Sequence, residues 1–99
     1  MMNRRKLIKQ GEKISVRFDF HERDLLREHT NGYPKLTDRL RLSLLDQDKI
    51  IARYSLEELN ILLEFITAEA IHTNDKIQHN DLVRLCDRLI EICKSYIEE

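Results

Sequence analysis

The stretch that decides the fold is Ile14-Ser15-Val16-Arg17-Phe18-Asp19-Phe20, in which apolar and polar side chains alternate. Period-two alternation predicts a strand over residues 14–20 with one buried and one exposed face. Asp19 is suited to cap a following helix, because Glu22 stands three residues later, as in a capping box. The chain is therefore expected to pass from a strand into a helix at this point.

Beyond this helix the sequence predicts a second short helix and a second strand. The stretch Thr30-Asn31-Gly32 ends the first helix, since glycine suits a left-handed cap. Pro34 is tolerated in the first turn of the next helix, whose apolar side chains repeat every four residues at Leu36, Leu40 and Leu44. After the polar turn at residues 46–48, the β-branched stretch 49–54 predicts a strand, with a helix as the alternative.

The C-terminal half predicts two long helices. Ser55 and Glu58 form a second capping box. An apolar stripe follows at Leu59, Leu62, Leu63, Ile66 and Ala70, and another helix over residues 78–96 has its apolar face at Leu82, Leu85, Cys86, Leu89, Cys93 and Tyr96. A short polar turn between them, at residues 72–75, indicates an antiparallel helical hairpin.

The expected fold is α+β and mostly helical, in the order β-α-α-β-α-α, with a small two-stranded sheet and a C-terminal antiparallel helical hairpin. The direction of strand pairing stays open, because helical connections allow either. A single core is expected at Ile14, Val16, Phe18, Leu25, Leu59, Leu62, Ile66, Leu82, Leu85, Cys86 and Leu89.

Length and composition limit the organisation of the chain. The 99 residues fit one domain. No apolar run approaches the roughly 20 residues that cross a bilayer, and the basic N-terminus leads into no signal-peptide stretch. Residues 1–12 are expected to be a flexible basic arm, because Leu7 and Ile8 stand alone among charges. Residues 13–99 are expected to be the single α+β domain.

The cysteines and the missing catalytic motifs argue against several function classes. Cys86 and Cys93 stand seven positions apart, about 10.5 Å along one helix, too far to bridge, so both are expected to be reduced and buried in a cytoplasmic protein. The chain has no Gly-rich phosphate loop, no nucleophile elbow and no zinc-ligand spacing. We therefore expect no enzyme activity, no metal site and no cofactor.

Four stretches resemble a small bacterial domain of unknown function that accompanies plasmid- and mobile-element-borne passenger proteins. They are Lys13-Ile14-Ser15-Val16-Arg17-Phe18, Glu22-Arg23-Asp24-Leu25-Leu26, Leu36-Thr37-Asp38-Arg39-Leu40 and Tyr54-Ser55-Leu56-Glu57-Glu58-Leu59. The resemblance covers residues 13–98. It implies a bacterial, cytoplasmic protein and brings no catalytic residue.

Charge is divided unevenly along the chain. Residues 1–50 hold 12 basic and 8 acidic side chains, whereas residues 51–99 hold 5 and 10. This polarity and the open edges of a two-stranded sheet favour a small protein-interaction module. We expect it to form a homodimer or to bind a protein from the same locus.

The alternative hypothesis is a DNA-binding regulator of the ribbon–helix–helix type. In such a unit, strands of two chains pair and their outward side chains enter the major groove. Ser15 and Arg17 would hold those positions, and the basic residues that would neutralise phosphates are Arg4, Arg5, Lys6, Lys9 and Lys13.

Overall fold

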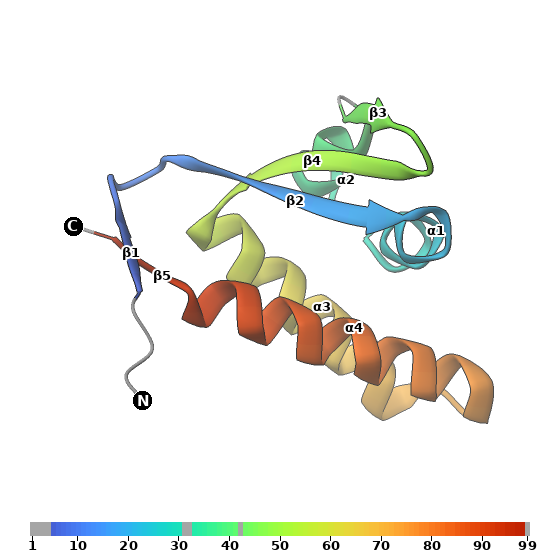
Figure 1. Ribbon diagram of the computed structural model, residues 1–99. Helices are drawn as coiled ribbons and strands as arrows, with labels where there is room; N and C mark the ends of the chain where they lie inside the picture. The colour runs from blue at the N-terminus through green and yellow to red at the C-terminus, as the bar shows by residue number, and fades with distance from the viewer. Residues whose placement is uncertain (1–4, 31–32, 42, 99) are drawn as a thin grey trace.

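The computed structural model describes residues 5–30, 33–41 and 43–98. This part of the chain is α+β, as the sequence predicts (Figure 1). Its elements are β1 (Lys6–Ile8), β2 (Lys13–Asp19), α1 (Phe20–His29), α2 (Pro34–Arg41), β3 (Leu44–Asp46), β4 (Lys49–Ser55), α3 (Leu56–His72), α4 (Lys76–Lys94) and β5 (Tyr96–Glu98). None of the helices in these ranges is long and apolar enough to cross a membrane.

The two predicted strands, β2 and β4, form the centre of an antiparallel sheet. All seven residues of β2 pair with β4, from Lys13 opposite Ser55 to Asp19 opposite Lys49. This register places Ile14, Val16 and Phe18 beside Tyr54, Ala52 and Ile50, and all six side chains are buried. The alternation in the sequence therefore identifies the core-facing side of β2 correctly.

The predicted capping boxes are present at the starts of α1 and α3. The Asp19 carboxylate accepts a hydrogen bond from the backbone N–H of Glu22 at 2.7 Å, and the Glu22 carboxylate accepts one from Asp19 at 2.9 Å. Ser55 and Glu58 make the same reciprocal pair. Because this cap turns the chain, Phe20 begins α1 instead of ending the strand.

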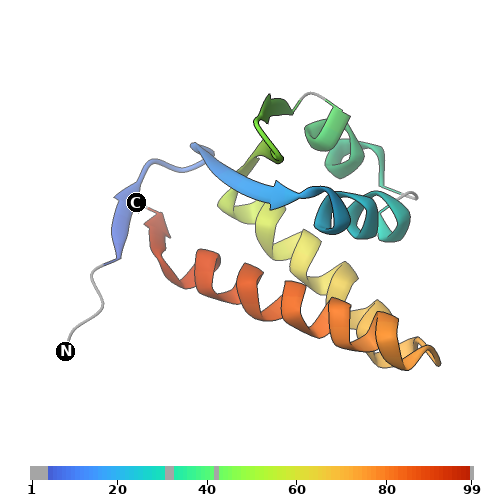
Figure 2. The ribbon, with the colours of Figure 1, turned by 45° about the vertical axis from the view of Figure 1, so that its right-hand side comes forward.

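The predicted core is confirmed, since all eleven residues expected in it are buried. In both views the sheet, α1 and α2 lie on one side of α3 and α4, which pack along each other (Figures 1 and 2). Phe18 and Tyr54 meet edge to face with ring centroids 6.4 Å apart. The core thus lies between the covered face of the sheet and the helices.

A third strand, β3, corrects the expected two-stranded sheet. It pairs antiparallel with β4, and the sheet order is β2-β4-β3. The four-residue spacing predicts Leu44 on the apolar stripe of the second helix, but α2 ends at Arg41 and Leu44 lies in β3, 66% exposed. The polar turn at residues 46–48 lets this short segment fold back on β4, with Gln47 at a positive φ of 57°.

The flexible arm expected over residues 1–12 is also corrected where the structure describes it. Residues 6–8 form β1 and pair in parallel with β5. Ile8 is only 3% exposed, and the backbone N–H of Gly11 donates to the Glu98 carboxylate at 3.0 Å. The partner of β1 is β5, about 90 positions later in the sequence. Local sequence patterns do not indicate such a distant pairing. Residues 1–4 of the arm, and Asn31 and Gly32 of the predicted helix stop, lie outside the described residues.

The last helix and its cysteines differ from expectation in detail. Helix α4 begins at Lys76, because the Asp75 side chain caps it, and Tyr96 belongs to β5. Both cysteines are free thiols; Cys86 is buried, whereas Cys93 is half-buried. Burial raises the pKa of the Cys93 thiol.

Candidate functional site

One face of the three-stranded sheet lies opposite the face that carries the buried side chains of β2 and β4, and we call it the outer face. The residues of β2 that alternate with the buried ones lie there, and the register brings Ser15 opposite Arg53 and Arg17 opposite Ile51. On the other side of β4, Leu44 is opposite Ile51. The outer face therefore includes Lys13, Ser15, Arg17, Leu44, Ile51 and Arg53, and at its other end Asp19, Asp46 and Lys49.

A hollow of about 230 Å³ lies on the outer face beside α2, and we call it the basic hollow. Its lining residues are Lys13, Arg39, Leu44, Ile51 and Arg53. Three of the five are cations, and they come from β2, α2 and β4. The other two are aliphatic side chains of β3 and β4, so the hollow has both a cationic and an apolar wall.

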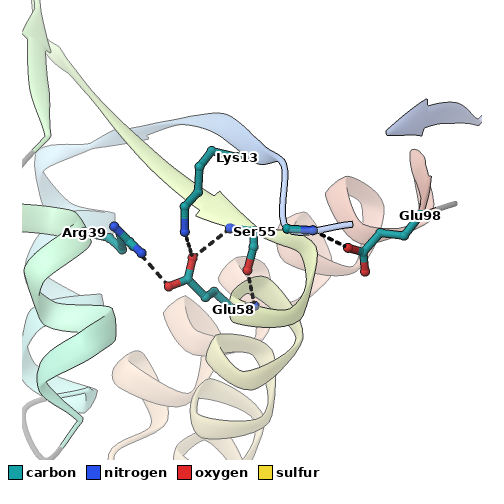
Figure 3. Close-up of polar contacts among 6 residues, drawn as sticks. Lys13, Arg39, Ser55, Glu58 and Glu98 are labelled. Carbon is teal, nitrogen blue, oxygen red and sulfur yellow. Dashed lines mark hydrogen bonds and ion pairs between the residues drawn. The ribbon is translucent and has the colours of Figure 1, made fainter. Parts of the chain in front are cut away.

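A buried carboxylate positions two of these cations. Glu58, only 3% exposed, accepts a hydrogen bond from the Lys13 ammonium at 2.7 Å. Its second carboxylate oxygen accepts one from Nε of Arg39 at 3.1 Å. Figure 3 shows Lys13 and Arg39 reaching this carboxylate from different elements. Glu58 thereby joins β2, α2 and α3 at the edge of the hollow.

The Glu58 carboxylate is ionised over the whole physiological pH range. Burial by itself would raise its pKa, but the hydrogen bonds from Lys13, the Ser55 backbone and Arg39 stabilise the charged form. Together they lower the pKa from 4.5 to about 2. At neutral pH, Lys13 and Arg39 are thus held by a negative charge.

The outer-face cations Arg17 and Arg53 differ in their partners. The Arg17 guanidinium forms an ion pair with Asp46 at 2.5 Å. Arg53, by contrast, is exposed and makes no hydrogen bond or ion pair with any residue that the structure describes. The whole Arg53 guanidinium is therefore available to another molecule in the basic hollow.

The structure separates the residues predicted to bind nucleic acid into two groups. Ser15 and Arg17 lie on the outer face, as the alternation predicts, and Lys13, which was grouped with the basic arm, lies beside them. Arg5, Lys6 and Lys9 are exposed on or beside β1, in the separate two-stranded sheet. Arg4 lies outside the described residues.

The pairing of β2 differs from that of a ribbon–helix–helix unit, in which the strand pairs with its copy in another chain. One edge of β2 is taken along its full length by β4. At the other edge, the Arg88 guanidinium donates a hydrogen bond to the Arg17 carbonyl and lies 5.4 Å from the centre of the Phe18 ring. Glu22 holds Arg88 there through two hydrogen bonds of 2.7 Å.

Sequence reasoning missed Arg39, Leu44, Ile51 and Arg53 as members of the site. Arg53 is exposed and Ile51 is half-exposed, and both lie on β4, a strand that the sequence predicts. Their place beside Ser15 and Arg17 depends on the register between β2 and β4, which the sequence alone does not give. Arg39 reaches the hollow from α2 through its contact with Glu58. No local pattern indicates that contact, because 19 positions separate the two residues.

A metal centre requires several ligating side chains close together. The described ranges hold no group of three His, Cys, Asp or Glu side chains that could bind a metal ion. Comparison of the chain with protein-family models, with curated proteins and with solved structures gave no match. The function is therefore inferred from the geometry of the surface.

Proposed function

We propose that the protein is a small interaction module that self-associates through β3. The observation that carries the proposal is the exposure of two adjacent leucines on this edge strand, 66% for Leu44 and 71% for Leu45. Proteins normally protect edge strands with charges, prolines or covering elements. Two exposed leucines at such an edge favour an interface.

The edge of β3 has the geometry for strand addition. Among the described residues β3 pairs with β4 alone, so its other edge has no strand partner. Successive side chains of a strand point to opposite faces of the sheet. Leu44 and Leu45 therefore lie next to the free edge of β3, one on each face. Pairing with β3 of a second copy would join two three-stranded sheets in one isologous contact.

We assign the long helices to the scaffold of this module, as an antiparallel hairpin. Only residues 73–75 separate α3 from α4. Next to this turn, Nδ1 of His79 donates to the Ala70 carbonyl at 2.7 Å, and the Thr73 hydroxyl donates to the Gln78 side chain at 2.8 Å. The two free thiols favour the reducing cytoplasm as its location.

The test is the molar mass in solution, measured by sedimentation equilibrium over a range of concentrations. We expect the parent chain to approach the dimer mass and Leu45→Lys to stay monomeric, because a charge would be buried at the contact. Ile77→Lys is the matched control: Ile77 is 75% exposed but lies at the start of α4, and this variant should dimerise normally.

Two results would contradict self-association through β3. One is a monomeric mass for the parent chain at high micromolar concentration. The other is a dimer that Leu45→Lys leaves intact, which would place the interface elsewhere. Circular dichroism of all three proteins should match, so that a change in mass reports the interface and not the fold.

A further inference from the structure

The basic hollow gathers more hydrogen-bond donors than its one carboxylate can use. Glu58 accepts from Nζ of Lys13 and from Nε of Arg39. The terminal amino groups of Arg39 make no hydrogen bond with a described residue, and neither does the Arg53 guanidinium. Two guanidinium groups, those of Arg39 and Arg53, thus have donors available in the basic hollow. The Arg39 guanidinium is also held in place by its hydrogen bond to Glu58.

The net charge at this point is positive. Lys13, Arg39 and Arg53 contribute three positive charges, and the ionised Glu58 removes one, which leaves a net charge of +2. A phosphate monoester carries about −1.5 to −2 at neutral pH. Arginine forks match phosphate oxygens in pairs, which makes arginine the preferred residue for such recognition.

The apolar wall and the size of the hollow further limit the class of ligand that can bind there. Leu44 and Ile51 offer aliphatic surface for an organic group attached to the phosphate. Beyond the hollow, Arg17 is already neutralised by Asp46, and Lys49 is in register with two carboxylates, Asp19 and Asp46. A polymer backbone would need a continued row of available cations, whereas a volume of about 230 Å³ suits one phosphate with a small substituent.

We propose that the basic hollow binds the phosphate group of a small phosphate ester, with Arg39 and Arg53 as its guanidinium donors and Leu44 and Ile51 against its organic part. Lys13 is a positioning residue, because its ammonium is engaged by Glu58. Binding at this hollow does not require self-association through β3, so the two proposals can fail separately.

The experiment is a titration followed by amide chemical shifts, at fixed ionic strength and with AMP, inorganic phosphate and adenosine as probes. We expect AMP and inorganic phosphate, but not adenosine, to shift the amides around Arg53 and Arg39. Arg53→Ala should weaken AMP binding at least tenfold. Arg84→Ala is the control: its side chain is 80% exposed on α4, and the variant should bind as the parent does.

Three outcomes would overturn the proposal. The first is the absence of shifts with millimolar AMP or phosphate. The second is AMP binding that Arg53→Ala leaves unchanged. The third is a single-stranded oligonucleotide that binds more tightly than AMP, with an affinity that falls steeply with salt, because the ligand would then be a nucleic-acid strand.

Discussion

The Glu58 carboxylate lies 2.7 Å from the Lys13 ammonium, although 45 positions separate the two residues in the chain. Lys13 is the first residue of β2, and Glu58 lies in the first turn of α3. The same carboxylate accepts a hydrogen bond from Arg39 of α2 and from the Ser55 backbone. One buried anion therefore fixes the relative positions of three elements and shapes the basic hollow.

Replacing this anion should destabilise the protein measurably. Glu58→Gln removes the charge that pairs with Lys13 and Arg39, and both cations are about 70% buried. We expect the free energy of unfolding to fall by about 1–3 kcal/mol, as measured by urea denaturation. Glu57→Gln is the matched control at an exposed neighbouring position and should change stability by less than about 0.5 kcal/mol. Equal stabilities of the two variants would contradict this role of Glu58.

The low pKa of Glu58 predicts a loss of stability in acid. Because the pKa is 4.5 when unperturbed and about 2 in the folded protein, folding favours the ionised form. This contribution, roughly 3 kcal/mol, is present above pH 5 and is lost as the pH falls from about 5 toward 2. Unfolding curves over this range should be less steeply pH-dependent for Glu58→Gln than for the parent. Parallel pH profiles would contradict the prediction.

The pairing of β1 with β5 predicts that the N-terminal segment contributes to stability. Ile8→Ala should lower the free energy of unfolding by about 2 kcal/mol or more, because Ile8 is 3% exposed and belongs to the main core cluster. Leu7→Ala, at a neighbouring side chain that is 61% exposed, should have little effect. If the two variants melt alike, Ile8 does not contribute to the core.

The sequence predicts the elements whose signals are local. The capping boxes at Asp19 and Ser55 depend on residues three positions apart, and the apolar faces of β2, α3 and α4 depend on short periods. Each of these signals lies within a few residues of the structure that it predicts. They suffice to identify the core and the succession of the main strands and helices.

The features that escaped prediction depend on pairing between distant segments. Within residues 5–12 the only apolar neighbour of Ile8 is Leu7, and Ile8 is buried because β1 pairs with β5 and Ile8 joins the main core cluster. Leu44 continues the four-residue spacing of α2 in the sequence. In the structure it lies in β3 instead, because this short segment pairs with the edge of β4. The basic hollow requires the β2–β4 register and the reach of Arg39 to Glu58. None of these contacts has a signature within a single stretch of sequence.

The parallel pairing of β1 with β5 gives the molecule a particular response to tension. Lys6, Leu7 and Ile8 lie opposite Tyr96, Ile97 and Glu98, and both strands run in the same direction. A force that pulls β1 from its N-terminal side and β5 from its C-terminal side slides one strand along the other. The hydrogen bonds between them are then loaded together, not opened one after another as in a zipper. Under such a force, β1 and β5 must therefore be sheared apart before the force is transmitted to the core.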